Sequence, residues 1–268
     1  MRLLVEVRLL VENSWEWFIS KFEDLSRIDL TAYKRPQMER RINSFMRSAG
    51  ASDYKSFLEL IKNDAPIYKR FLEHITINVS EFFRNANHWS VLQNQILPLL
   101  LADRKSLRVW SAGCSTGEEP YSLAMIFKEK RIPLTDKILA TDLDQDVLNR
   151  AMQGIYSSKA VQGIPPAYLN RYFINQGDKY QVSEELRSMI TFKRHDLLRE
   201  PFGHGFDLIL CRNVVIYFTE ETKNRLYQRF TDSLTNGGVL FIGSTEQIFL
   251  ARELGLKTIA TFFYQKGN

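Results

Sequence analysis

The chain has 268 residues, of which 44% are hydrophobic and 25% are charged, a balance that is typical of globular proteins. This length fits one domain of about 180 residues with a smaller companion domain. No apolar run approaches the roughly 20 residues of a membrane-spanning helix, and a net charge of +5 is too modest to indicate nucleic-acid binding.

The first residues and the cysteines bear on the cellular compartment. Charged residues interrupt the apolar positions of the first twelve residues, which argues against a secretory signal, so we interpret 1–14 as an N-terminal extension. Cys114 and Cys211 are not the spaced pair of a disulfide framework or a zinc site, and we expect no bound metal. We expect a cytoplasmic protein without direct membrane insertion.

Residues 38–49 carry apolar side chains at helical spacing and predict an amphipathic helix. On this helix Arg40 and Arg47 point away from the apolar stripe, and Arg41 lies on its flank. The three arginines belong to the densest basic stretch of the chain. This face is either a solvated helix surface or a docking face for an acidic partner, and both interpretations stay open.

Two more amphipathic patterns, over 54–61 and 67–75, predict helices that complete a small N-terminal bundle. We therefore assign 15–85 to a helical domain with its linker, and 86–268 to a second domain.

The second domain alternates short β-prone runs with helical patterns, which is typical of a doubly wound, Rossmann-like α/β sheet. The predicted strands are Leu107–Trp110, Lys137–Thr141, Ile190–Lys193, Phe206–Cys211 and Gly238–Ile242, with Thr258–Gln265 as the last strand. The predicted helices that cover the sheet are Tyr121–Lys130, Gln145–Met152 and Glu220–Leu234.

One segment interrupts this rhythm, because 155–189 supplies about 35 residues where a wound fold needs only a short connection. Within it, 171–182 holds two β-prone runs about a Gly-Asp turn, which predicts a small antiparallel hairpin. Such an insertion either recognises a partner or covers the edge of the sheet as a lid.

The run from Gly113 to Gly117 closes the first predicted strand and opens a helix, and Asp142 ends the next strand. Such strand ends face a ligand crevice in α/β sheets. The run is neither a dinucleotide-binding motif nor a P-loop. S-adenosylmethionine, which has a net positive charge, suits the acids Glu118, Glu119 and Asp142 better. A local role for Glu119 at the positive end of the helix dipole stays open.

Two later strand ends complete the expected crevice. Asp196 and Leu197 follow the strand that ends at Lys193, and Asn213 follows the strand that ends at Cys211. We expect adenine recognition and closure of the cofactor pocket at these positions. Roles as turn or capping residues stay open for Asp196 and Asn213.

Four strings, taken together, resemble the chemotaxis receptor methyltransferase family, CheR. They are Asn78-Val-Ser-Glu-Phe-Phe-Arg84, Ser115-Thr-Gly-Glu-Glu-Pro-Tyr-Ser122, Ala140-Thr-Asp-Leu-Asp144 and Cys211-Arg-Asn-Val-Val-Ile-Tyr-Phe218. The resemblance extends from about Trp15 to the C-terminus, and four strings in this order are specific. It implies an enzyme that methylates glutamates on the cytoplasmic helices of chemoreceptors in chemotaxis adaptation, with S-adenosyl-L-homocysteine as its second product.

The resemblance also implies site residues, position by position. The family motif Asn-x-Thr-x-Phe-Phe-Arg matches this chain with Ser in place of Thr, which keeps the hydroxyl. With the loop residues, the expected cofactor-binding set is Asn78, Ser80, Arg84, Gly113, Glu119, Asp142, Asp196, Leu197, Asn213 and Val214. The expected partners are methyl-accepting receptors and no nucleic acid, with docking on Arg40, Arg41 and Arg47. We expect a monomer.

Methyl transfer to a glutamate needs no general base, because a carboxyl group with a pKa of about 4.3 is ionised at pH 7. A positioned cation and a hydroxyl are more useful, since they align the carboxylate and replace its hydration. We therefore expect Arg84 and Tyr217 to be catalytic. A structural ion pair for Arg84 and aromatic packing for Tyr217 are the alternatives.

Two other functions compete with this one. A methyltransferase for RNA, DNA or a small molecule would keep the pocket, but enzymes that methylate base amines commonly carry Asn/Asp-Pro-Pro-Tyr/Phe where this chain has Asn213-Val-Val-Ile. A module that senses the cofactor without catalysis is the second alternative. The presence of Arg84, Asn213 and Tyr217 argues against it.

Overall fold

The computed structural model describes residues 13–76 and 78–267. Within these ranges no helix is long and apolar enough to cross a membrane. The expected N-terminal extension, 1–14, lies outside the described residues except for Asn13 and Ser14.

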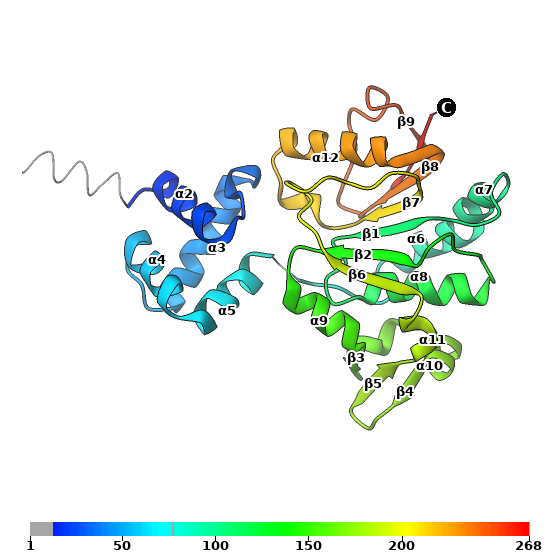
Figure 1. Cartoon of the computed structure of the whole chain (residues 1–268), viewed down its shortest axis with the longest axis horizontal. Helices are drawn as coiled ribbons and strands as arrows, with labels where there is room; N and C mark the ends of the chain where they lie inside the picture. Colours follow the sequence, from blue (N-terminus) through cyan, green and yellow to red (C-terminus); the bar gives the residue numbers. More distant parts are fainter. Residues whose placement is uncertain (1–12, 77, 268) are drawn as a thin grey trace, which may run out of the picture. The chain divides into compact units, whose positions relative to one another are not determined.

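The described residues divide into two compact units. The helical unit comprises 13–76 and 217–222, and the sheet unit comprises 78–216 and 223–267. Figure 1 labels most of the helices and strands of each unit.

The helical unit is a bundle built around aromatic side chains. Its elements are α2 (Trp15–Ser26), the 3₁₀ turn η1 (Leu30–Ala32), α3 (Arg35–Ser48), α4 (Tyr54–Asn63) and α5 (Ala65–Thr76) (Figure 1). The predicted apolar stripe of α3 is buried at Met38, Ile42, Phe45 and Met46. Phe57 of α4 and Phe71 of α5 meet edge to face with ring centroids 4.9 Å apart, a geometry that stabilises the pairing of these helices.

A seven-stranded sheet forms the centre of the sheet unit, in the order β6-β2-β1-β7-β8-β10-β9. Its strands are β1 (Val109–Ala112), β2 (Ile138–Asp142), β6 (Ile190–Arg194), β7 (Phe206–Cys211), β8 (Leu234–Ile242), β9 (Leu256–Ala260) and β10 (Phe263–Lys266). The strands from β6 to β8 in this order are parallel, and β10 is antiparallel to both of its neighbours. The predicted Rossmann-like α/β fold is confirmed.

Three strand predictions were wrong in detail. Strand β8 begins at Leu234 rather than at Gly238. The predicted last strand, Thr258–Gln265, is two antiparallel strands, because Phe262 has a φ of 69° and turns the chain between β9 and β10. The first strand begins at Val109 rather than at Leu107, which pairs with Leu134 in an isolated bridge.

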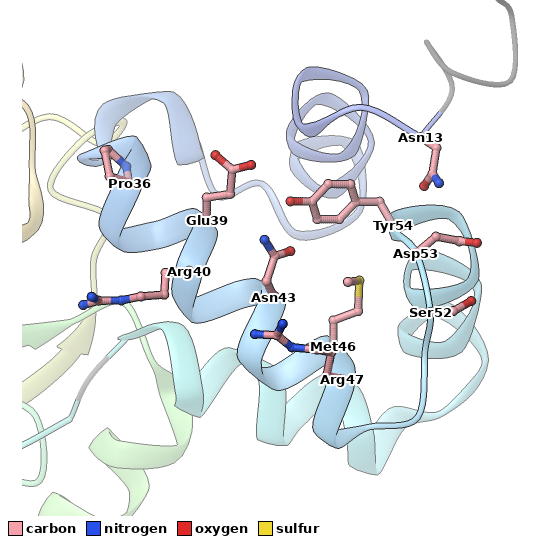
Figure 2. Close-up of a pocket in the computed structure, with 10 residues that line it drawn as sticks. All are labelled: Asn13, Pro36, Glu39, Arg40, Asn43, Met46, Arg47, Ser52, Asp53 and Tyr54. Atoms are coloured by element: carbon pink, nitrogen blue, oxygen red, sulfur yellow. The ribbon is translucent and has the colours of Figure 1, made fainter.

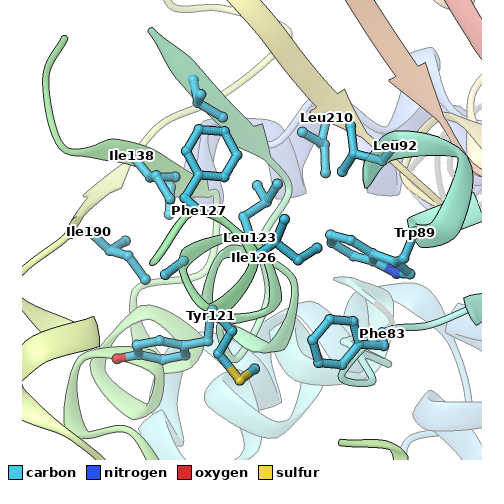
Figure 3. Packing of buried hydrophobic residues seen from close by; sticks show 14 of the residues in the cluster. Phe83, Trp89, Leu92, Tyr121, Leu123, Ile126, Phe127, Ile138, Ile190 and Leu210 are labelled. Carbon is cyan, nitrogen blue, oxygen red and sulfur yellow. The ribbon is translucent and has the colours of Figure 1, made fainter. Parts of the chain in front are cut away.

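Helices cover the sheet and bury the core shown in Figure 3. Helix α8 (Glu118–Glu129) supplies Leu123, Ile126 and Phe127, which pack with strand residues such as Ile138 and Leu210. The other helical elements are α6 (Ala86–Val91), the π-helical turn η2 (Leu92–Ile96), α7 (Leu97–Leu101), α9 (Gln145–Gln153), the 3₁₀ turn η4 (Val215–Tyr217) and α12 (Glu220–Ser233).

The insertion forms a separate three-stranded antiparallel sheet in the order β3-β5-β4 (Figure 1). The predicted hairpin consists of β4 (Phe173–Asn175) and β5 (Lys179–Val182), joined through Gly177 with a φ of 87°. A strand that was not predicted, β3 (Ile155–Ser157), pairs with β5. The insertion also contains η3 (Ala160–Gly163), α10 (Pro166–Tyr172) and α11 (Glu184–Arg187).

The strand order contains a topological switch between β1 and β7. From β1 the chain passes through α8 to β2 on one side, whereas β7 adds to the other side of β1. In open α/β sheets the carboxyl ends of the strands at such a point border a crevice that binds ligands. The residues that follow β1, β2, β6 and β7 therefore form the candidate site.

Candidate functional site

Two predicted residues meet at the switch point. Gly113 follows β1 with a φ of 80°, and a Cβ atom built on it would lie 2.4 Å from Cγ2 of Val214, which follows β7. Only glycine fits at this position without displacement of Val214. Ser115 and Gly117 also have positive φ values, 49° and 95°. The turn between β1 and α8 is therefore tight, and its backbone lies close to the crevice.

The end of β2 holds this turn. One carboxylate oxygen of Asp142 accepts a hydrogen bond from the backbone N–H of Ser115 at 2.8 Å, and the other accepts from that of Asp144 at 3.1 Å. The carbonyl of Thr141 accepts from the backbone N–H of Gly113 at 2.8 Å. Burial raises the pKa of the Asp142 carboxyl, and the backbone hydrogen bonds oppose this shift. Asp142 thus holds the loop and also places a carboxylate at the crevice.

Asn78 and Ser80 lie at the start of the sheet unit and reach the same region. Nδ2 of Asn78 donates to Oδ2 of Asp144 at 2.9 Å, and the Ser80 hydroxyl hydrogen-bonds to Glu118. Glu118 is buried, which raises its pKa, although the Thr116 hydroxyl donates to its carboxylate at 2.7 Å. The chain that enters the sheet unit is therefore fastened to the acidic loops that follow β1 and β2.

A buried ion pair holds Glu119. Its Oε2 lies 3.3 Å from Nη1 of Arg212, and its Oε1 accepts from the Ser111 hydroxyl at 2.8 Å. The side chains of the pair are 12% and 2% exposed, respectively. Burial raises the pKa of the Glu119 carboxyl, and the charges of Arg212 and Arg84 lower it. The predicted acid thus has a counter-charge, Arg212, which the sequence places beside Asn213 at a strand end but whose pairing with Glu119 was not predicted.

Arg84 lies in a loop whose backbone is fixed by hydrogen bonds. Its neighbours Phe83 and Asn85 have positive φ values, 51° and 60°. The carbonyl of Arg84 accepts from Nη2 of Arg212 at 2.8 Å and from Nε1 of Trp89 at 3.0 Å. Strained backbone held in this way is common at functional sites.

Asp196 and Leu197 shape the loop after β6. Oδ1 of Asp196 accepts from the backbone N–H two residues further along the chain at 2.8 Å, which is the turn role left open above. The carbonyl of Leu197 accepts from the guanidinium of Arg229. The backbone N–H of His195 donates to the carbonyl of Asp142 at 2.9 Å, so this loop borders the end of β2.

The turn after β7 is held by an acid that the sequence reasoning missed. Glu246 accepts from the backbone N–H groups of Asn213 and Val215, each at 3.1 Å, and from that of Gly243. Burial raises the pKa of Glu246, and these N–H groups lower it. The usable signal was an acid four residues after the end of an apolar strand, in Gly243-Ser-Thr-Glu246.

The other predicted residues belong to the helical unit. The carbonyl of Tyr217 accepts from the backbone N–H of Lys34 at 2.9 Å. Arg41 is half-buried, and its Nε donates to the carbonyl of His74, so this arginine fastens α3 to α5.

Arg40 and Arg47 are exposed on α3, two helical turns apart. They line a groove of about 660 Å³ together with Asn43 of α3 and Tyr54 at the start of α4. Figure 2 shows these side chains along α3 and across the groove from it. Glu39 and Asp53 also line the groove, so it carries both signs of charge, with Arg40 and Arg47 as its basic groups.

The crevice of the sheet unit has the chemistry to hold a cationic ligand. Glu119 and Asp142 place carboxylates at the ends of adjacent strands, and carboxylates attract ammonium and sulfonium groups and accept hydrogen bonds from hydroxyls. Because Gly113 lies so close to Val214, this position of the turn has no room for a side chain. These residues fit the predicted S-adenosylmethionine.

Comparison with known proteins adds independent findings. Residues 78–261 match a family model described as the SAM binding domain of CheR methyltransferase, and 13–76 match its all-alpha domain. A chemotaxis protein methyltransferase of Listeria innocua is 49% identical over 240 residues, which cover 89% of this chain and 92% of that protein. Proteins with the same description from Borreliella burgdorferi and Escherichia coli are 39% and 34% identical, and the matches cover 82% of this chain in both cases and 83% and 79% of those proteins.

Proposed function

This chain belongs to the CheR methyltransferase family, and we propose that it methylates glutamate side chains on the cytoplasmic helices of chemoreceptors. The product would be a glutamyl methyl ester, which removes one negative charge from the receptor. The relatives from three organisms, all described as chemotaxis protein methyltransferases, support a role of this ester in chemotaxis.

S-adenosylmethionine is the cofactor, and when bound it supplies a methyl group on a positively charged sulfur. The ten candidate cofactor residues all belong to the sheet unit. Glu119 would hold the ammonium group of the cofactor, and Asp142 would accept hydrogen bonds from its ribose hydroxyls. The turns at Gly113 and at Asn213 and the loop at Asp196 would enclose the rest of the cofactor.

The acceptor chemistry requires alignment rather than deprotonation. A receptor glutamate is already ionised at neutral pH, so the enzyme has to orient its carboxylate and replace its water shell. We assign the first task to the Arg84 guanidinium, which the hydrogen-bonded loop at Phe83–Asn85 presents. Tyr217 stays the proposed hydroxyl donor of the reaction.

The basic face of α3 would guide the receptor to the enzyme. Arg40 and Arg47 are exposed, and an acidic helix with several glutamates complements them. Arg41 differs from the other two, because it also connects α3 to α5. We therefore expect receptor affinity to depend mainly on Arg40 and Arg47.

One observation carries the proposal. The carboxylates of Glu119 and Asp142 lie at the switch point of a chain whose helical and sheet units both match the same methyltransferase family.

The test is a transfer assay with S-adenosylmethionine labelled in its methyl group. The purified protein is incubated with membranes that contain chemoreceptors, with tRNA, and with buffer alone. We expect label only in the receptor fraction, and we expect mild base to release it, because esters hydrolyse in base. Label in tRNA, or base-stable label in the receptor, would reject the proposal.

A further inference from the structure

We propose that Arg212 is a positioning residue that holds two parts of the cofactor crevice, the Glu119 carboxylate and the backbone of the Arg84 loop, with a single buried guanidinium. The inference rests on the proposed roles of Glu119 and Arg84 in the crevice. The role of Arg212 concerns binding of the cofactor. The test of this role and the test of glutamate methylation can therefore fail independently of each other.

The first support is that the two terminal nitrogens of the guanidinium contact different partners. Nη1 of Arg212 lies 3.3 Å from Oε2 of Glu119, whereas Nη2 donates to the carbonyl of Arg84 at 2.8 Å and to Oδ1 of Asn85 at 3.4 Å. A planar guanidinium carries its donors on separate nitrogens in a fixed geometry that reaches both partners, whereas the three donors of a lysine share one nitrogen on a flexible stem.

The second support is the packing of the arginine. Its side chain is 2% exposed, and its Cζ lies 4.6 Å from the ring centroid of Phe241 and 5.4 Å from that of Trp89. The indole of Trp89 donates to the same Arg84 carbonyl that Arg212 reaches. The position of the guanidinium is therefore fixed by rings that also belong to the hydrophobic core.

The third support is the loop that Arg212 holds. Phe83 and Asn85 both adopt left-handed backbone conformations, which cost free energy for residues other than glycine. The Phe83 N–H donates to the Ser122 hydroxyl at 3.0 Å on one side of Arg84. Arg212 and the Trp89 indole supply the contacts on the other side, so loss of Arg212 would leave the loop that presents Arg84 less firmly held.

The charge of Arg212 has a separate consequence for Glu119. Burial raises the pKa of this carboxyl, and Arg212 is the first of the groups that oppose the shift. The ionisable groups that act on Glu119 are Arg212, Arg84 and the buried thiols of Cys114 and Cys211. Burial raises the pKa of both thiols well above their usual value, so they stay neutral at pH 7. Loss of Arg212 would therefore raise the pKa of Glu119 further.

The test measures the dissociation constant of S-adenosylmethionine by calorimetry between about pH 6 and about pH 8. Because the Arg212 charge lowers the pKa of Glu119, we expect the affinity of Arg212→Met to fall more steeply than that of the unchanged protein as the pH is lowered, by up to about ten-fold per pH unit. A merely structural role for Arg212 would weaken binding by the same factor at every pH.

Three variants separate the components of this effect. Glu119→Gln should bind S-adenosylmethionine weakly at all pH values. Adding Arg212→Met to this variant should lower the affinity little further, because the two residues act as a pair. Arg212→Lys keeps the charge but not the fork, so we expect a weakened affinity with the same pH profile as the unchanged protein. Arg212→Lys also keeps the proposal testable if Arg212→Met does not fold.

The matched control is Arg104→Met. Arg104 pairs with Asp207 at the opposite end of β7, with Nε and Oδ1 2.8 Å apart. Its loss should lower thermal stability and leave the cofactor affinity unchanged. Unchanged binding in Arg212→Met, a loss that does not depend on pH, or normal binding in Arg212→Lys would overturn the proposal.

Discussion

The carboxylate of Asp142 accepts a hydrogen bond from the backbone N–H of Ser115 at 2.8 Å, so the acid at the end of β2 holds the turn that follows β1. The same carboxylate is proposed to bind the cofactor. Removal of Asp142 therefore acts twice, on the shape of the turn and on the charge of the crevice.

Asp142→Ala should weaken the binding of S-adenosylmethionine by roughly ten-fold to a hundred-fold in a protein that remains folded, because hydrogen bonds to charged groups contribute about 1.5–3 kcal/mol. Calorimetry measures the affinity, and circular dichroism checks the fold. Asp136→Asn is the control. Asp136 precedes the N-terminal end of β2, is exposed and pairs with Arg108. An Asp142→Ala protein with normal affinity would show that this acid is outside the pocket.

Gly113→Ala should destabilise the protein by about 1–3 kcal/mol beyond the cost of its backbone conformation, because the new methyl group would overlap Val214. Urea unfolding measures this loss. The control is Gly177→Ala, which has a similar φ of 87° but no atom within 4 Å of the added Cβ. Val214→Ala in the Gly113→Ala background should restore part of the stability. Equal losses of stability in Gly113→Ala and Gly177→Ala would show that Gly113 does not lie close to Val214.

Arg40→Ala with Arg47→Ala should slow receptor methylation several-fold at low salt and leave cofactor affinity unchanged, since steering by exposed charges acts on encounter. The rate of the unchanged protein should fall with added salt more steeply than that of the variant. Lys21→Ala with Lys62→Ala removes the same charge from exposed positions of α2 and α4 and serves as control. Identical salt dependence in all three proteins would exclude the docking role.

The native protein should resist thiol reagents at about pH 8. Cys114 is 1% exposed and Cys211 is fully buried, and burial raises the pKa of both thiols, so labelling requires opening of the structure. Added S-adenosylmethionine should slow labelling further, because it stabilises the folded state. Mass spectrometry after timed alkylation follows both sites. Rapid labelling of the native protein at either site would show that the cysteine is accessible.

The sequence allowed prediction of the parts of the site that depend on local chemistry. A tight turn after an apolar strand indicates Gly113, and an acid at the end of the next strand indicates Asp142, because parallel strands bring such ends together. The apolar stripe of α3 was also predictable, since it depends only on helical spacing.

The missed parts depend on contacts between distant residues. Arg212 meets Glu119 across 93 positions, and Glu246 reaches the backbone of Asn213 across 33 positions. A single sequence shows neither of these contacts, although the place of Glu246 soon after an apolar strand marks it as a candidate. The π-helical turn η2 and the division of the last strand at Phe262 arise from local backbone geometry that composition does not encode.

The central claim is methyl transfer to a glutamate carboxylate, and mass spectrometry of the receptor helices after reaction tests it most directly. We predict that glutamate-containing peptides gain the mass of one CH₂ group only when both S-adenosylmethionine and the active protein are present, and that mild base removes it. Methylation of lysine, arginine or another side chain, or receptor peptides of unchanged mass, would contradict the account.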